Sequence, residues 1–294
     1  MSFSQDTKQE LSKINNLAKK DEVKYELIGY LISCNACILK KNTIRYATEN
    51  EYNINRFAKL LNNLNIEYTI EMEGKTFVIK FNYKNDQFVT IKNQSVLVNC
   101  DKLKPEDKRI LIRGAFLGAG SINNPENKYH LEIKLSNLEN ANCVKQILKE
   151  FDLNFRLLNR AGKHCVYLKE GEEISNFLAL IGANNAVLKF EDIRVQRQMR
   201  GKVNRLVNCK SANLNKTLNA SIEQIDAIKK LQDTNKFNKL DENLKEIALL
   251  RLQNPDMPLS ELGKLLKNPV GKSGVNYRLK KIIEIAGEIW VKKN

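Results

Sequence analysis

The residues best suited to binding a charged ligand lie near the C-terminus. From Lys264 to Lys281 the sequence has six basic residues and no acidic residue. Lysine and arginine side chains neutralise phosphate groups, so this composition indicates contact with a nucleic-acid backbone. The alternative is that these residues only form the solvated basic face of a protein interaction module. The predicted DNA-binding residues are Lys264, Lys267, Lys272, Ser273, Asn276, Tyr277, Arg278, Lys280 and Lys281.

A helix is predicted to carry most of these residues, because its buried side is recognisable in the sequence. Apolar residues recur on it at the spacing of a core-facing helix. At about 100° per residue, Ser273, Tyr277 and Lys280 then point away from the core, and Ser273 is a suitable N-cap. Asn276 and Arg278 lie on the flanks, where they suit base edges and phosphates equally well. The apolar residues are Val275, Leu279, Ile282 and Ala286.

Two helices and a turn are predicted before this last helix. Apolar residues at helical spacing run from Leu240 to Leu252 and stop before Asn254 and Pro255. A short helix over about 258–266 follows, and residues 268–271 (Asn-Pro-Val-Gly) form a turn. This order predicts a helix-turn-helix, whose last helix meets base edges with its N-terminal part. The short helix is expected to bury Leu262, Leu265 and Leu266.

A second basic stretch lies upstream. Arg194, Arg197 and Arg200 are three residues apart, and no acid occurs between Arg194 and Lys216. Spacing by three places them along one ridge of a helix. Two roles fit equally well: phosphate contacts, or solvation of a segment that connects two domains. The residues predicted as phosphate contacts in the first case are Arg194, Arg197, Arg200 and Arg205.

The first 200 residues divide into two similar halves. Each has the order helix, two strands, helix, two strands, helix, with short strands bounded by Gly, Asn or Pro. The closing helix of the first half is predicted at about 83–91. The remaining chain is predicted to be all helical, with helices over 184–200 and 212–231 separated by Gly201. We expect an α+β domain in two halves, 1–104 and 105–200, followed by an all-α domain, 201–294.

The helices that open the two halves can be aligned. Gly29 then matches Gly114, and Ser33 matches Gly118. Small residues four positions apart lie on one face of a helix. The two helices are therefore expected to pack closely against each other along that face.

The second of these helices resembles a known motif. Residues 113–121 (RGAFLGAGS) are similar to the LAGLIDADG motif of homing endonucleases. In that family two such helices pack together, and an acid near the end of each holds Mg²⁺. The matching positions here are Ala119 and Cys34, and neither offers the oxygen ligand that Mg²⁺ requires. The resemblance implies the two-repeat fold without catalytic residues, metal or other cofactor. An active nuclease is the disfavoured alternative.

Composition narrows the class of protein further. A net charge of +15 over 294 residues attracts polyanions, either nucleic acid or an acidic membrane. The longest apolar run, 177–183, is far shorter than the roughly 18 residues of a spanning helix, and we expect a cytoplasmic protein with no membrane association. The six cysteines are expected to be free thiols. Cys34 and Cys37 form a C-x-x-C pair, but no second pair completes a zinc site.

The whole chain is similar to the WhiA family of bacterial proteins. That family combines a degenerate endonuclease-like domain with a helix-turn-helix similar to region four of sigma factors. The resemblance implies a nucleoid-associated regulator that binds double-stranded DNA in cell division and chromosome segregation, or in sporulation gene control. A module acting through transcription or cell-division proteins is the alternative. The segments that carry the resemblance are Arg113–Ser121, Asn204–Cys209, Ala212–Thr217 and Lys272–Leu279.

Overall fold

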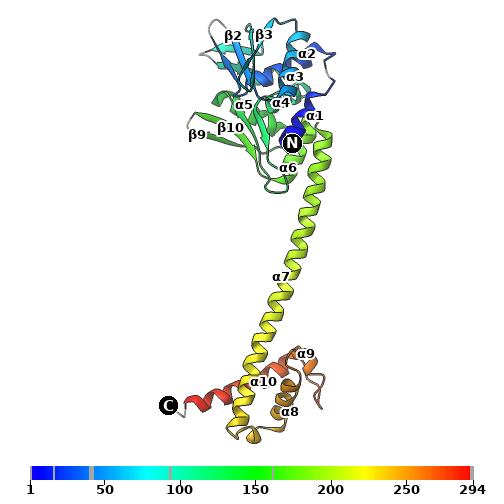
Figure 1. Ribbon diagram of the computed structural model, residues 1–294, viewed down its shortest axis with the longest axis vertical. Coiled ribbons are helices and arrows are strands. Elements are labelled where there is room, and N and C mark those ends of the chain that lie inside the picture. The colour runs from blue at the N-terminus through cyan, green and yellow to red at the C-terminus, as the bar shows by residue number, and fades with distance from the viewer. Residues whose placement is uncertain (1, 16, 40–42, 93–94, 161, 292–294) are drawn as a thin grey trace. The chain divides into compact units, whose positions relative to one another are not determined.

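The computed structural model describes residues 2–15, 17–39, 43–92, 95–160 and 162–291. The chain divides into two compact units, Met1–Gln198 and Met199–Asn294. The first mixes helices with sheets, and the described part of the second is helical (Figure 1). This confirms the predicted fold class.

The first half of the first unit opens with two helices and then alternates strands with a helix. Its elements are α1 (Phe3–Ser12), α2 (Lys20–Leu31), β1 (Ala36–Ile38), β2 (Thr43–Thr48), α3 (Glu51–Asn63), β3 (Tyr68–Glu73), β4 (Thr76–Asn82), β5 (Val89–Lys92) and β6 (Ser95–Val98). The second half repeats the order of helix, two strands, helix and two strands, and then closes with a helix. Its elements are η2 (Cys100–Lys102), α4 (Pro105–Ala119), β7 (Gly120–Ile122), β8 (Leu131–Leu135), α5 (Leu138–Glu150), β9 (Arg156–Arg160), β10 (Lys163–Leu168) and α6 (Gly171–Ile181).

The two halves form sheets of the same topology. The strand order is β1-β2-β4-β3 in one and β7-β8-β10-β9 in the other, with antiparallel neighbours throughout. Alternate residues of β2 and β8 are buried, so each sheet turns one face to the core. The sheets meet where Ser33 bridges Leu135 and the Cys34 amide donates to the carbonyl of Lys134 at 3.1 Å. The repeat predicted from the sequence is therefore present.

The opening helices α2 and α4 pack against each other without bulky side chains between them. A Cβ placed on Gly29 would overlap the backbone of α4, and one on Gly114 would overlap the carbonyl of Glu26. A Cβ on Gly118 would come within 2.8 Å of the Ser33 side chain. The alignment of Gly29 with Gly114 and of Ser33 with Gly118 thus corresponds to a close helix–helix contact, as the sequence predicted.

The first half closes differently from the prediction. In place of a helix over 83–91, β5 and β6 form an antiparallel hairpin. The Asp86 carboxylate accepts hydrogen bonds from the amides of Phe88 and Val89, at 2.7 and 2.9 Å, and this turn excludes a helix there. Val89 and Val96 are buried, so tertiary packing stabilises the hairpin.

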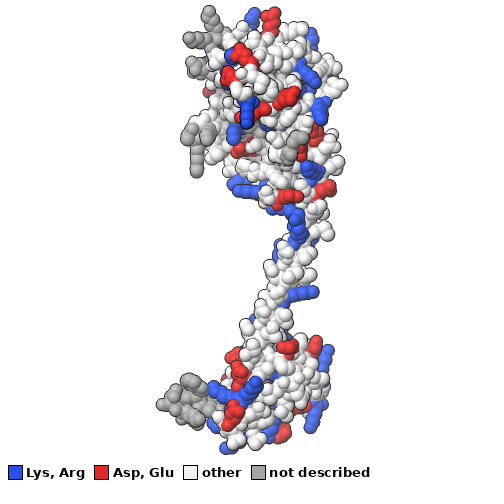
Figure 2. Space-filling view, in the orientation of Figure 1, with Lys and Arg blue, Asp and Glu red and all other residues white. Residues whose placement is uncertain are grey.

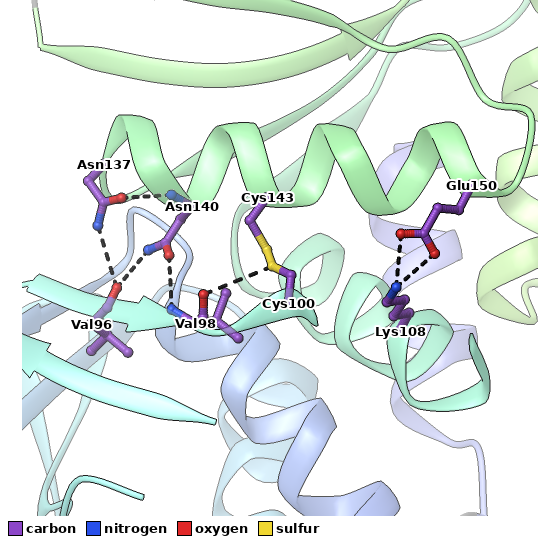
Figure 3. The surroundings of a disulfide bond; sticks show 8 residues. All are labelled: Val96, Val98, Cys100, Lys108, Asn137, Asn140, Cys143 and Glu150. Carbon is purple, nitrogen blue, oxygen red and sulfur yellow. Dashed lines mark hydrogen bonds and ion pairs between the residues drawn. A yellow bond between two sulfur atoms is a disulfide. The ribbon is translucent and has the colours of Figure 1, made fainter. Parts of the chain in front are cut away.

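Hydrogen bonds join this hairpin to α5 of the other half (Figure 3). The Asn140 side chain donates to the carbonyl of Val96 at 2.7 Å and accepts from the amide of Val98 at 3.4 Å. Next to it, Cys100 and Cys143 form a disulfide, with Cα atoms 6.2 Å apart. The expectation that all six cysteines are free was wrong for this pair, because a separation of 43 residues carries no local signal of their proximity.

One helix, α7 (Asn184–Asp233), leaves the first unit and enters the second. The predicted break at Gly201 is wrong, since the helix continues through it. Glycine lowers helix stability by about 1 kcal/mol relative to alanine but leaves the hydrogen-bonding pattern intact. The helix ends by packing Ile228 and Leu231 into the core of the second unit.

The second unit is a small helical domain. Its remaining elements are η3 (Phe237–Lys239), α8 (Glu242–Gln253), α9 (Leu259–Leu262) and α10 (Lys272–Val291). Its core gathers buried aliphatic side chains from α7, α8, α9 and α10, among them Ile247 and Leu262. The order of α8, α9 and α10 is that of the predicted helix-turn-helix.

Candidate nucleic-acid interface

The last helix, α10, separates a buried face from an exposed one. The predicted core residues Val275, Leu279, Ile282 and Ala286 are all buried. Tyr277 is 68% exposed, and Lys280 is also exposed. The buried and exposed faces of α10 are therefore the ones predicted from the sequence. The 3.6-residue period of the helix determines which side chains share a face.

The other predicted contact residues lie at the surface or at its edge. Asn276 and Arg278 are half-buried on the flanks of α10. Within the described chain, none of the six basic residues from Lys264 to Lys281 has a carboxylate within 4.0 Å of its charged group. The exposed members of the set, besides Tyr277 and Lys280, are Lys264, Lys267, Lys272, Ser273 and Lys281.

The turn before α10 depends on a close backbone approach. A Cβ on Gly263 would overlap the carbonyl oxygen of Val270, whose amide donates to the Gly263 carbonyl at 3.1 Å. Only glycine lets these two segments meet. The Lys267 amide also donates to the Glu246 carboxylate of α8 at 2.6 Å. These contacts hold the turn against α8 and direct the first residues of α10 outward.

Two local predictions in this region were wrong. Ser273 does not cap α10, because the helix begins at Lys272 and the Val275 amide donates to the carbonyl of Gly271, which occupies the N-cap position. Leu265 is 51% exposed, because α9 ends at Leu262 and the chain turns away before Leu265 reaches the core.

Arg251, at the end of α8, was missed by the sequence reasoning and organises the next loop. Its side chain is buried, and Nη1 donates to the carbonyls of Asn254, Pro255 and Met257, at 3.3, 3.2 and 2.8 Å. Burial lowers the pKa of Arg251. The Ser221 hydroxyl of α7 donates to the same Pro255 carbonyl. An arginine at the end of an amphipathic helix looks like a surface residue, so nothing in the sequence indicated this role.

The arginines at the start of α7 differ in their surroundings. The Arg194 guanidinium is 3.1 Å from the Glu191 carboxylate. Arg197 donates to the carbonyl of Pro125 at 2.6 Å and lies 4.3 Å from the centre of the Tyr129 ring. Arg200 and Arg205 are exposed, and neither has an ion pair in the described part of the chain. Arg194 and Arg197 thus make contacts within the first unit, and Arg200 and Arg205 face solvent.

The ends of α2 and α4 are where a homing endonuclease would hold its metal. Ala119 is the last residue of α4, and Cys34 lies just after the end of α2 at Leu31. One carboxylate, Glu132 of β8, shares a surface pocket with Cys34, but it is paired with Lys134 at 3.2 Å and His130 at 3.4 Å. Burial is the largest single effect on the pKa of Glu132 and raises it, but the hydrogen bonds and charges of Lys134 and His130 together lower the pKa below its ordinary value. Among the described residues, no three His, Cys, Asp or Glu side chains are grouped to hold a metal.

A half-buried lysine lies close to these helix ends. The Lys8 ammonium is 5.8 Å from the centre of the Phe116 ring of α4. The pKa of Lys8 is lowered to about 8: burial is the main cause, the charge of Cys34 opposes the shift, and the charge of Lys134 adds to it.

The fold and its surfaces define a two-part protein, in which a LAGLIDADG-like domain precedes a helix-turn-helix unit. Residues 108–200 match the family described as the WhiA LAGLIDADG-like domain, and residues 203–286 match the WhiA C-terminal HTH domain. A probable cell division protein WhiA of Thermoanaerobacter sp. (strain X514) is 38% identical over 98% of both chains. The chain therefore belongs to the WhiA family.

Other relatives and solved structures agree with this assignment. A probable cell division protein WhiA of Clostridium beijerinckii is 49% identical over 65% of this chain and 61% of that protein. The crystal structure of full-length DUF199/WhiA from Thermotoga maritima is similar over 98% of this chain and 99% of that one, with 29% identity and a TM-score of 0.59. In the described residues, no helix has the length and apolarity to cross a lipid bilayer.

Proposed function

We propose that this protein is a non-enzymatic regulator that binds double-stranded DNA through α10 and the turn before it. The observation that carries the proposal is the exposed face of α10: its core residues are buried, and its outward residues, from Lys272 to Lys281, include four bases and no acid. A helix that presents such a face after a helix-turn-helix fits the major groove with its N-terminal half.

Within this proposal the contact residues have two roles. Lys264, Lys267, Lys272, Lys280 and Lys281 neutralise phosphates and position the helix, and this accounts for most of the affinity. Ser273, Asn276, Tyr277 and Arg278 lie at or beside the leading edge of α10, where a side chain reaches base edges. Arg205, exposed on α7, supplies a further phosphate contact.

Membership of the family supports the biological role that we propose. Relatives are named probable cell division proteins, so we place this chain among the cytoplasmic, nucleoid-associated regulators of cell division and chromosome segregation, or of sporulation genes. The absence of an acid at Cys34 and Ala119, and the pairing of Glu132 with two basic groups, support a role without cleavage. Supercoiled DNA incubated with the protein and Mg²⁺ should stay intact. Nicking of the DNA that is abolished by a chelator would overturn the proposal that the protein is not an enzyme.

The salt dependence of duplex binding tests the placement of the DNA face. The logarithm of the binding constant falls with the logarithm of salt by about 0.9 per phosphate contacted. Changing Lys280 and Lys281 together to alanine should flatten this slope by about 1.8. The control is K145A/K149A, which removes the same charge from exposed positions of α5 and should leave the slope unchanged. Equal slopes for the wild type and K280A/K281A would show that α10 does not face the DNA.

A further inference from the structure

The middle of α7 exposes an apolar stripe that no described part of the chain covers. Every residue from 202 to 216 is exposed, and five large apolar side chains between 199 and 214 each expose 53–63% of their surface. They belong wholly to the second unit. This stripe is formed by Met199, Val203, Leu206, Val207 and Leu214.

The five side chains share one side of the helix. At about 100° per residue they fall within an arc of about 100°, the width of a core-facing stripe. A helix that is surrounded by water is expected to be polar on all sides. A contiguous set of exposed Met, Val and Leu side chains instead marks a surface that another molecule covers.

The charges beside the stripe indicate what kind of molecule that is. On the same helical projection, Arg200 borders one edge of the stripe, Lys202 borders the other, and Lys210 lies within it. No acidic residue occurs from 193 to 222. In the face of α7 seen in Figure 2, the middle of the helix accordingly shows basic side chains among uncharged ones. Charges beside an apolar seam decide which helix can pair with it.

We propose that the apolar stripe of α7 is a docking site for an acidic amphipathic helix of another protein. Such a helix covers Met199, Val203 and Leu206 with its own apolar side chains, and its flanking Glu or Asp residues pair with Arg200 and Lys202. A second copy of this chain fits less well, because its acid-free α7 would bring bases against bases. Duplex DNA offers anions but nothing to cover the apolar side chains.

A synthetic helix tests this on the full-length protein. The probe is a labelled peptide with leucine at heptad positions a and d and glutamate at e and g, and its comparison peptide has lysine at e and g. The glutamate peptide should bind at least about tenfold more tightly than the lysine peptide, a difference of about 1.4 kcal/mol. Hydrogen exchange should slow in residues 199–214 when it binds.

Variants locate the site on the stripe. M199Q/L206Q removes two apolar side chains without changing charge and should weaken binding of the glutamate peptide about tenfold or more, and R200Q/K202Q should weaken it as well. Asn208→Gln, on the opposite side of the exposed helix, is the matched control and should bind normally. Because the stripe residues are not the proposed α10 contacts, duplex affinity of M199Q/L206Q should equal that of the wild type.

Three results would each overturn the docking proposal. The first is equal affinity of the protein for the two peptides, and the second is wild-type affinity of M199Q/L206Q for the glutamate peptide. The third is light scattering that shows a dimer of the wild type and a monomer of M199Q/L206Q. The last result would assign the stripe to a second copy of the chain. If M199Q/L206Q lost affinity for duplex DNA but bound the glutamate peptide as the wild type does, the stripe would be a DNA-binding surface.

Discussion

The Arg56 guanidinium of α3 donates two hydrogen bonds to the Glu26 carboxylate of α2, at 2.7 and 2.9 Å, and both side chains are buried. Arg113 of α4 lies close by, with Nη1 3.8 Å from the same carboxylate. This cluster joins three helices of the first unit, at the point where Gly114 of α4 packs closely against Glu26 of α2. Desolvated charges of this kind are stable only as a set, because each compensates the burial of the others.

Replacing Glu26 with glutamine should therefore destabilise the first unit by about 3–5 kcal/mol, since Arg56 would remain buried without its counter-charge. The measurement is urea unfolding followed by circular dichroism, with hydrogen exchange in α2 and α3 to localise the effect. Glu22→Gln, which breaks the ion pair of half-buried Glu22 with exposed Lys19, is the control and should change stability by less than about 1 kcal/mol. A loss below about 1 kcal/mol in E26Q would contradict the importance of the buried pair.

Two glycines should respond to alanine in opposite directions. Gly114→Ala places a methyl group on the Glu26 carbonyl and should cost about 3 kcal/mol by forcing α2 and α4 apart. Gly201→Ala, in α7, meets no atom within 4 Å and should stabilise the helix by about 0.5–1 kcal/mol. Thermal unfolding of the two variants measures both effects. If G114A were as stable as the wild type, the close packing of the two helices would be refuted.

The helix-turn-helix should be equally sensitive at Gly263. An alanine there would collide with the Val270 carbonyl, so we expect the turn to open and duplex binding to fall by about tenfold or more, a cost of at least about 1.4 kcal/mol. Gly287→Ala in α10 is the matched control, because its Cβ meets open space. Fluorescence anisotropy with a labelled duplex, and hydrogen exchange in α9 and α10, read out the change. Normal exchange and binding in G263A would show that the turn has room for a side chain.

The Cys100–Cys143 disulfide should stabilise the first unit. Closing a loop of 43 residues lowers the entropy of the unfolded chain by an amount worth about 4 kcal/mol. Reductant should therefore lower the unfolding midpoint of the wild type and leave C100S/C143S unaffected. Alkylation of the denatured protein before reduction should label only the free cysteines, Cys34, Cys37, Cys165 and Cys209. Labelling of all six in the unreduced, denatured protein would show that the pair is not bonded.

The lowered pKa of Lys8 predicts a pH dependence with a definite sign. The folded state releases the Lys8 proton at about pH 8, while an unfolded lysine keeps it until about pH 10.4. Between these values the unfolded state binds more protons, so stability rises with pH. Below pH 8 both states are protonated and the burial penalty is constant.

Lys8→Met should therefore be more stable than the wild type at neutral pH, with a difference that shrinks as the pH is raised from about 8 to 10. Unfolding midpoints across that range measure the difference, and Lys145→Met, at an exposed position, serves as the control. A gap between K8M and the wild type that stays constant with pH would contradict an altered Lys8 titration.

Local periodicity determined much of this protein from its sequence alone. The stripe Val275, Leu279, Ile282 and Ala286 identified the buried side of α10, and small residues at Gly29 and Gly114 identified the helix pair. These signals are reliable because the helix repeat places each side chain on a known face, whatever lies beyond it. The acid-free stretch from Lys264 to Lys281 was likewise visible as composition, and its exposure followed from the same periodicity.

What the tertiary structure decided were contacts between segments far apart in the chain. The bonding of Cys100 to Cys143, the β5–β6 hairpin against Asn140, and the buried role of Arg251 each depend on a partner that local sequence does not specify. Gly201 and Ser273 show the converse. Gly201 favours a break in the helix, and Ser273 favours the N-cap position. Each of these local preferences is worth about 1 kcal/mol, and the hydrogen bonds of the surrounding helix outweigh it.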